Sequence, residues 1–266
     1  MITIRTSSMC HYIKELTYFP DGTQHITLPI LNYDDELRIT WHYENDAELF
    51  TLICIRKHYC RNKCRLFLPY IPNARMDRVK NPNDVFTLKY FCEVINDLNF
   101  ATVFVSDPHS NVALALLDRV KILDCEPDIV NVIDEVFDLD TELCLFYPDE
   151  GAMKRYSEVI KWPYTFGMKK RRWEDGKILG LEIVNPEMVK DKNILIVDDI
   201  CSRGGTFYYS AQALKNAGAK HIYLYITHCE KTIFNGEIFS SGLIDHVYTT
   251  DSIFKPEWQN EMITII

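Results

Sequence analysis

The chain has 266 residues and a formal net charge of −9, and no part of it approaches the ~20 consecutive apolar residues of a membrane span. The length suits one large or two medium domains, and the apolar share of 47% and charged share of 25% are ordinary for a soluble globular protein. The negative charge argues against a general nucleic-acid-binding protein, and the N-terminus lacks the charged-then-apolar layout of a signal peptide. Nine cysteines, an odd number, fit reduced thiols, so we expect a cytoplasmic protein that binds neither nucleic acid nor membranes.

Helical and extended patterns alternate along the first half of the chain, which ends near residue 125. The clearest helix signal is an apolar stripe from Val85 to Leu98 at the i, i+3, i+4, i+7 spacing of an amphipathic helix. The expected elements are a helix over 49–59, a strand over 65–69, a helix over 85–98, a strand over 101–105 and a helix beginning over 111–117.

One grouping between the first two of these elements could suit a zinc ion, because Cys60 and Cys64 lie close to His58. No second pair of cysteines or histidines at metal-site spacing follows in the sequence. The pattern therefore favours ordinary thiols.

The second half repeats the alternation of strands and helices. We expect strands over 143–147, 194–197 and 221–227, and a helix over 207–217 that ends at Gly218. Such alternation predicts a doubly wound parallel sheet, in which ligands gather at the carboxyl ends of the strands.

A run of four cations, Lys169 to Arg172, stands beside Trp173 in this half. A solvated surface run or a targeting signal is the ordinary explanation of such a tetrad. Binding of a polyphosphate is the alternative.

The most informative segment is 193–206, which reads Asn-Ile-Leu-Ile-Val-Asp-Asp-Ile-Cys-Ser-Arg-Gly-Gly-Thr. Its apolar run predicts a buried parallel strand, and the Gly-Gly turn leads into a helix whose first N–H groups can bind phosphate. The adjacent Asp198 and Asp199 can hold a ribose diol or a divalent cation. An ordinary strand-to-helix junction with solvated acids would give the same pattern.

Five motifs, in order along the chain, resemble those of the ribose-phosphate diphosphokinase family, a branch of the phosphoribosyltransferase superfamily. They are Phe19-Pro-Asp-Gly22, Pro69 to Arg78, Ser106 to Ser110, Tyr147 to Arg155, and segment 193–206. The resemblance covers most of the chain. It implies an α/β fold of two phosphoribosyltransferase-like domains, each a mostly parallel sheet flanked by helices. Residues 1–125 would form the ATP side, and residues 126–266 would carry the ribose-phosphate loop.

The resemblance implies transfer of a diphosphoryl group from ATP to the 1-hydroxyl of ribose 5-phosphate, which gives phosphoribosyl diphosphate and AMP. Mg²⁺ would neutralise the polyphosphate. The motifs that contain Arg75, His109 and Lys169 favour this reaction over that of a plain phosphoribosyltransferase, which does not need them.

The resemblance also assigns roles to individual residues. Phe19 and Asp21 would reach the adenine from a neighbouring subunit, which implies a homo-oligomer with its adenine site near a subunit interface. The remaining assignments are Lys169, Arg171 and His109 for catalysis, Arg75, Met76 and Asp77 for ATP, Asp198, Asp199, Ser202, Arg203, Gly204, Gly205 and Thr206 for the ribose phosphate, and His109 and Asp149 for the metal.

The chain departs from the family pattern at three of these motifs. Met76 replaces a glutamine that contacts ATP, Thr23 stands where the family has glutamate, and Arg203 stands where the family has a small hydroxyl residue. A guanidinium at position 203 adds a charge and a bidentate donor. It could bind the ordinary 5′-phosphate more tightly or point to solvent. It could also accommodate a larger, more negative 5′ group, so ADP-ribose, and with it NAD-related metabolism, is an alternative acceptor. A non-catalytic relative that regulates an active synthetase is a further alternative, against which the retained Lys169 and Arg171 argue.

Overall fold

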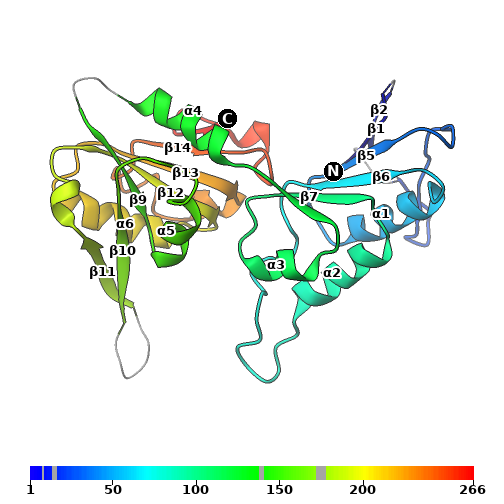
Figure 1. The fold of residues 1–266 in the computed structure, drawn as a ribbon, viewed down its shortest axis with the longest axis horizontal. Helices are drawn as coiled ribbons and strands as arrows, with labels where there is room; N and C mark the ends of the chain where they lie inside the picture. The colour runs from blue at the N-terminus through cyan, green and yellow to red at the C-terminus, as the bar shows by residue number, and fades with distance from the viewer. Residues whose placement is uncertain (8, 14–16, 138–140, 172–177) are drawn as a thin grey trace. The chain divides into compact units, whose positions relative to one another are not determined.

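The computed structural model describes residues 1–7, 9–13, 17–137, 141–171 and 178–266, with the backbone alone for 12–13, 169–171 and 178–180. The chain forms two compact units, unit 1 (Met1–Asp124) and unit 2 (Cys125–Ile266) (Figure 1). No helix within the described ranges combines the length and the apolar character that crossing a bilayer would require.

Unit 1 contains a six-stranded sheet in the order β2-β1-β5-β6-β7-β8, parallel from β5 to β8 and antiparallel at the β2-β1-β5 edge. A short hairpin, β3–β4, forms a separate two-stranded sheet. Helices α2 and α3 lie side by side (Figure 1). The elements are β1 (Ile2–Arg5), β2 (Cys10–Ile13), β3 (Thr17–Tyr18), β4 (Gln24–His25), β5 (Leu37–Trp41), α1 (Ala47–His58), β6 (Cys64–Leu68), α2 (Thr87–Asp97), β7 (Thr102–Ser106), α3 (Asn111–Leu116) and β8 (Val120–Leu123).

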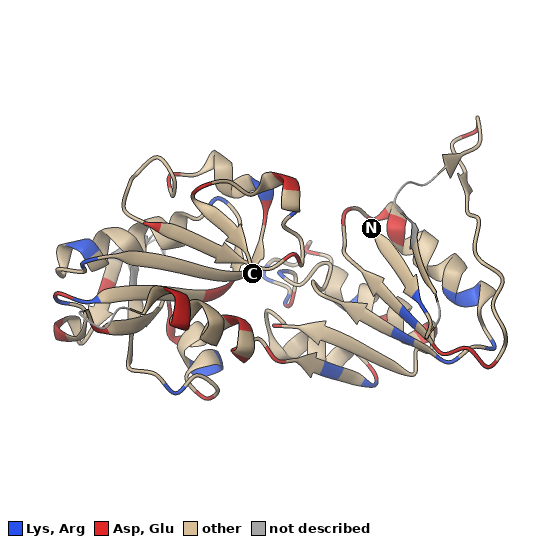
Figure 2. Ribbon diagram, turned by 90° about the horizontal axis from the view of Figure 1, so that it is seen from above, with Lys and Arg blue, Asp and Glu red and all other residues tan. Residues whose placement is uncertain are grey.

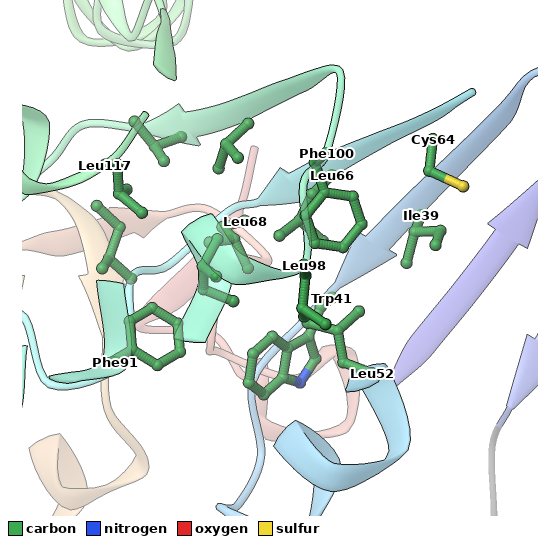
Figure 3. Packing of buried hydrophobic residues seen from close by; sticks show 14 of the residues in the cluster. Ile39, Trp41, Leu52, Cys64, Leu66, Leu68, Phe91, Leu98, Phe100 and Leu117 are labelled. Atoms are coloured by element: carbon green, nitrogen blue, oxygen red, sulfur yellow. The ribbon is translucent and has the colours of Figure 1, made fainter. Parts of the chain in front are cut away.

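One hydrophobic core holds unit 1 together, because its strands alternate between buried and more exposed residues. Figure 3 shows Trp41, Leu66 and Phe91 among the side chains that pack in this core. The indole N–H of Trp41 donates a hydrogen bond of 2.8 Å to the buried carboxylate of Glu48, so the largest core side chain has a polar partner.

Unit 2 contains a seven-stranded sheet in the order β11-β10-β9-β12-β13-β14-β15, parallel except for the antiparallel edge strand β11. Strands β10 and β11 form a ribbon that extends beyond the rest of the sheet (Figure 1). The elements are α4 (Glu126–Val136), β9 (Leu143–Tyr147), α5 (Glu150–Tyr156), β10 (Tyr164–Arg171), β11 (Ile178–Val184), β12 (Asn193–Cys201), α6 (Gly205–Asn216), β13 (Ile222–Cys229), β14 (His246–Thr249) and β15 (Ile263–Ile265), with short 3₁₀ helices η1 (Pro186–Met188), η2 (Lys231–Asn235) and η3 (Pro256–Trp258).

Both faces of the unit 2 sheet are covered, and each has its own apolar core. Every residue of β9 and the first five residues of β12 are buried, as the unbroken apolar runs predicted. Consistent with this, most of the strand length of this sheet is drawn as uncharged in Figure 2. The predicted α/β fold with mostly parallel sheets is confirmed.

The strands and helices predicted from the sequence all occur, with bounds that differ by a few residues. The main difference is that β12 continues past Val197 to Cys201, because its ladder with β13 extends through the pairs Ile200–His228 and Cys201–Cys229. Asp198 and Asp199 therefore lie within the strand and are held by its backbone. The antiparallel edge strands were not predicted.

Candidate active site

Two carboxylates near the end of β12 form the centre of the site in unit 2. Asp199 is 4% exposed, and its Oδ2 lies 3.3 Å from Nη1 of Arg155 on α5. Asp198 is half-buried, and its Oδ1 accepts a hydrogen bond of 3.0 Å from the backbone N–H of Asp199. Burial first, and then the neighbouring charge of Asp199, raise the pKa of Asp198 well above its ordinary value. Asp199 thus lies next to a guanidinium. The negative charge of Asp198 is disfavoured, and an approaching cation or hydroxyl donor would stabilise it.

Asp149 follows the carboxyl end of β9, the strand beside β12, and caps helix α5. Its Oδ1 accepts hydrogen bonds from the backbone N–H groups of Gly151, at 3.0 Å, and Ala152, at 3.1 Å. Its charge also contributes to the raised pKa of Asp198. Asp149 therefore has a structural role at this edge of the sheet, and its predicted role as a metal ligand remains a prediction.

The ribose-phosphate loop (residues 202–206) joins β12 to α6 through two glycines with different requirements. Gly204 has φ of +75°, and a Cβ added to it would lie 2.1 Å from Cδ1 of Ile238. The left-handed backbone conformation and the close approach of Ile238 therefore both require glycine at this position. A Cβ added to Gly205, the first residue of α6, meets no heavy atom of the described chain within 4 Å. The space beside the first residue of α6 is consequently open, and Thr206 is half-buried in the first turn of the helix. A helix start of this kind suits an anion.

The side chains of the loop differ in their surroundings. The Ser202 hydroxyl donates a hydrogen bond of 2.8 Å to Oε2 of Glu230, which follows β13, and lies 3.1 Å from the hydroxyl of Thr232. Arg203 is exposed, and its guanidinium makes no hydrogen bond or ion pair with the residues that the structure describes. Ser202 is thus directed to the protein, and Arg203 is accessible to solvent.

The loop backbone is packed against the segment that follows β13. A Cβ added to Gly236 would lie 1.8 Å from the carbonyl oxygen of Arg203, and Ile238 packs against Gly204. The backbone of Gly236 has φ of −107° and ψ of −170°, which any residue can adopt. Close approach of the two chain segments, rather than backbone conformation, therefore requires glycine at position 236.

In unit 1, two predicted segments follow the carboxyl ends of neighbouring parallel strands, β6 and β7, and so lie at the same edge of the sheet. Arg75, Met76 and Asp77 belong to the first segment and His109 to the second. Arg75 is exposed and the other three are half-buried, with Asp77 Oδ1 3.6 Å from Nε of Arg78. The topology therefore brings together these predicted ATP-side residues.

Phe19 and Asp21 lie in the turn of the β3–β4 hairpin and are exposed. Asp21 Oδ1 accepts hydrogen bonds from the Thr23 hydroxyl at 2.7 Å and the Thr23 N–H at 2.9 Å, and these bonds lower the pKa of Asp21. Thr23 thus closes the turn at the position where the family has glutamate. The exposed Phe19 ring, 5.2 Å from the ring of His25, remains accessible to another molecule.

The predicted catalytic cations Lys169 and Arg171 lie at the end of β10, in the ribbon with β11. The ladder is irregular between Lys170 and Arg171. The side chains of 169–171 and all of 172–177 lie outside the described residues, so the roles of both cations stay predictions.

The predicted metal ligands lie in different units of the chain. Within the described parts of the chain, no three His, Cys, Asp or Glu side chains are grouped to hold an ion by themselves. His109 and Asp149, the two predicted ligands, belong to units 1 and 2 respectively. Cys60 is exposed and Cys64 is buried, and both are free thiols.

Three residues that shape the site were not among the predicted site residues. Arg155 ends the Tyr147 to Arg155 motif, which was the signal for it. Glu230 directly follows the carboxyl end of β13, a position where α/β sheets bind ligands, and Gly236 follows η2, but no recognisable motif marks them.

Comparison with known proteins shows which proteins this chain is similar to. The phosphoribosyl transferase domain model matches residues 152–235, which include the ribose-phosphate loop. Proteins named ribose-phosphate pyrophosphokinase are 27% identical over 213 residues in Saccharolobus solfataricus, 28% over 243 residues in Thermococcus kodakarensis and 29% over 214 residues in Sulfolobus acidocaldarius. These matches cover 77%, 88% and 77% of this chain and 72%, 80% and 72% of the relatives.

The fold agrees with that of a solved structure described as phosphoribosylpyrophosphate synthetase from Mycobacterium smegmatis. The TM-score is 0.74 at 17% sequence identity, and the match covers 95% of this chain and 85% of that one. The chain thus contains a phosphoribosyl transferase domain match over residues 152–235 and resembles ribose-phosphate pyrophosphokinases (diphosphokinases) over most of its length.

Proposed function

We propose that this protein transfers a diphosphoryl group from ATP to the 1-hydroxyl of ribose 5-phosphate and releases phosphoribosyl diphosphate and AMP. The observation that carries the proposal is the open space beside the first residue of α6, which directly follows the acid pair of β12. A sugar with hydroxyls at one end and a phosphate at the other has complementary partners in these two features. The names of the curated relatives support the same reaction.

The ribose 5-phosphate is bound by residues that the fold holds in place. The N–H groups of Gly204 and Gly205 and the hydroxyl of Thr206 bind the 5′-phosphate, and α6 adds its dipole. Asp198 and Asp199 accept hydrogen bonds from the ribose hydroxyls. These donated hydrogen bonds favour the charged form of Asp198, which burial otherwise disfavours.

On the ATP side, Arg75 and His109 contact the polyphosphate, with Met76 and Asp77 beside them. Lys169 and Arg171 stabilise the charge that builds on the transferred group and the departing AMP. Diphosphoryl transfer depends on positioning and electrostatics more than on covalent chemistry, so these cations supply most of what the reaction needs. Phe19 and Asp21 contact the adenine of a neighbouring subunit in a homo-oligomer.

The reaction needs Mg²⁺, and the donor set at the sheet edge suits it. Asp149, Asp198 and Asp199 are hard oxygen donors, and a cation would offset the burial and the neighbouring negative charge that raise the pKa of Asp198. Mg²⁺ is usually held by one or two carboxylates, which this donor set can provide, together with water and substrate phosphates. When bound, it would neutralise charge on the polyphosphate.

Release of AMP tests the proposal. Purified protein with ATP, Mg²⁺ and ribose 5-phosphate should form AMP and phosphoribosyl diphosphate in equal amounts, measured by anion-exchange chromatography, and no AMP when the sugar is omitted. A folded, magnesium-supplied protein that releases no AMP with any ribose phosphate would contradict the proposal. It would favour a regulatory relative that binds an active synthetase.

A second candidate function uses the same chemistry on ADP-ribose, and the exposed Arg203 guanidinium favours it. The exposed guanidinium of Arg203, in the ribose-phosphate loop, can form a bidentate contact with the diphosphate bridge of a 5′-elaborated ribose. A small hydroxyl at this position could not make that contact.

The Arg203→Thr variant separates the two acceptors. If Arg203 binds the 5′ group, the variant should lose about tenfold or more of its kcat/KM for ADP-ribose and much less for ribose 5-phosphate, since one charged hydrogen-bonding partner is removed. Initial rates of AMP formation with each acceptor measure this ratio. Equal losses on both acceptors would count against a selective role for Arg203.

A further inference from the structure

We propose that Glu230 is a positioning residue that holds the ribose-phosphate loop in its phosphate-binding shape through the hydroxyl of Ser202. The proposal rests on the proposed function only in naming ribose 5-phosphate as the ligand. Glu230 and Ser202 are 28 residues apart in sequence, and the parallel pairing of β12 with β13 brings them together.

Glu230 holds one side of the ribose-phosphate loop through its backbone and through its side chain. Its backbone N–H donates a hydrogen bond of 2.8 Å to the carbonyl oxygen of Cys201, the last residue of β12. Its Oε2 accepts a hydrogen bond of 2.8 Å from the Ser202 hydroxyl and one of 2.9 Å from the Thr232 hydroxyl. The strand pairing ends at Cys201, so these side-chain bonds continue the connection by one residue into the loop.

The proton count of these groups decides what Ser202 can do. A hydroxyl has one proton, and the hydroxyls of Ser202 and Thr232 can each donate it to the same Oε2 of Glu230 or, across their 3.1 Å contact, one to the other. While its proton is donated to Glu230, Ser202 has only lone pairs left and does not donate to a phosphate. Ser202 therefore orients the backbone of the loop, and phosphate is bound by the N–H groups of the next residues and by Thr206.

Pre-ordering of this kind lowers the entropy that is lost when a phosphate binds, because the loop no longer has to be immobilised by the ligand. Loss of Glu230 should consequently weaken the binding of the sugar phosphate. ATP binding and the rate of the chemical step should change little, because Glu230 contacts neither reacting group.

Three variants test the proposal in the full-length protein. Glu230→Ala should raise the KM for ribose 5-phosphate, and its dissociation constant by titration calorimetry, about tenfold, the loss expected for a hydrogen bond to a charged acceptor. Ser202→Ala should have a similar effect, and the double variant should be no worse than the larger single one, because both act through one contact. Glu230→Gln, which keeps an acceptor oxygen, should restore most of the affinity.

Glu257→Ala serves as the matched control, since Glu257 is an exposed glutamate of the same unit in η3. A merely structural Glu230 would lower the melting temperature and worsen kcat and both KM values together, and additive effects in the double variant would exclude action through Ser202. Either result would overturn the proposal, as would unchanged ribose 5-phosphate affinity in Glu230→Ala.

Calorimetry with ribose 5-phosphate, alone and with α,β-methylene-ATP, keeps this test separate from that of the proposed reaction. Weaker binding by Glu230→Ala in a protein that releases no AMP would uphold the positioning role while the proposed function fails. A wild-type protein that does not bind ribose 5-phosphate under either condition would overturn the positioning role as well.

Discussion

Replacing Gly236 with alanine is expected to disrupt the ribose-phosphate loop and to raise the KM for ribose 5-phosphate about 10- to 100-fold. The added Cβ would lie 1.8 Å from the carbonyl oxygen of Arg203, a contact that only a shift of the backbone can relieve. Overpacking of a well-packed region costs about 1 to 3 kcal/mol, and each 1.4 kcal/mol corresponds to about tenfold in an equilibrium constant. Steady-state kinetics with varied ribose 5-phosphate and thermal unfolding measure both consequences.

Gly205→Ala is the informative contrast, because it adds the same methyl group in the same loop. A Cβ at position 205 meets no described heavy atom within 4 Å, and Gly205 is the first residue of α6. Its melting temperature should therefore be unchanged or slightly higher, while the methyl group intrudes on the space proposed for the phosphate. Gly236→Ala should lose stability and affinity together. Wild-type stability and KM in Gly236→Ala would mean that this contact does not hold the loop.

The contrast between these glycines illustrates what the sequence could predict. Gly204 and Gly205 stand in a recognisable local pattern of strand, acids and turn, so their place in the turn before α6 could be predicted from their neighbours in the chain. Gly236 and Glu230 act on that pattern from the end of another strand, and only the register of β12 with β13 makes them neighbours. A sequence gives the periodicity of each strand but not which strands pair, so contacts of this kind stay hidden.

The same reasoning explains which strands could be predicted from the sequence and which could not. Strand β9 and the first part of β12 are buried on both sides, so their unbroken apolar runs marked them plainly. Strand β10 of the ribbon ends in a cluster of cations, and this run was interpreted only as a charged segment. The pairing of β10 with β11 depends on both segments together, so the pattern of either segment alone does not predict it.

Removal of the charge at Lys169 or Arg171 is expected to have the largest effect on turnover. The two positions match the cations of a mobile loop that closes over the triphosphate in the family that the sequence resembles. Their interaction should be strongest when negative charge builds on the transferred group, so it lowers the barrier more than it strengthens ground-state binding. Loss of one such donor typically costs about 10²- to 10³-fold in kcat. Lys169→Ala and Arg171→Ala should therefore lower kcat by this order, with KM values changed only a few-fold.

Lys170→Ala is the matched control, because it removes a cation from the same strand. The ladder between β10 and β11 is irregular between Lys170 and Arg171, and the sequence Met168-Lys-Lys-Arg also allows a register shifted by one residue. A large loss of kcat in Lys170→Ala with little loss in Lys169→Ala would move the catalytic lysine by one position. Unchanged turnover in both Lys169→Ala and Arg171→Ala would remove the assignment of this segment, because no other part of the proposal requires a charge there.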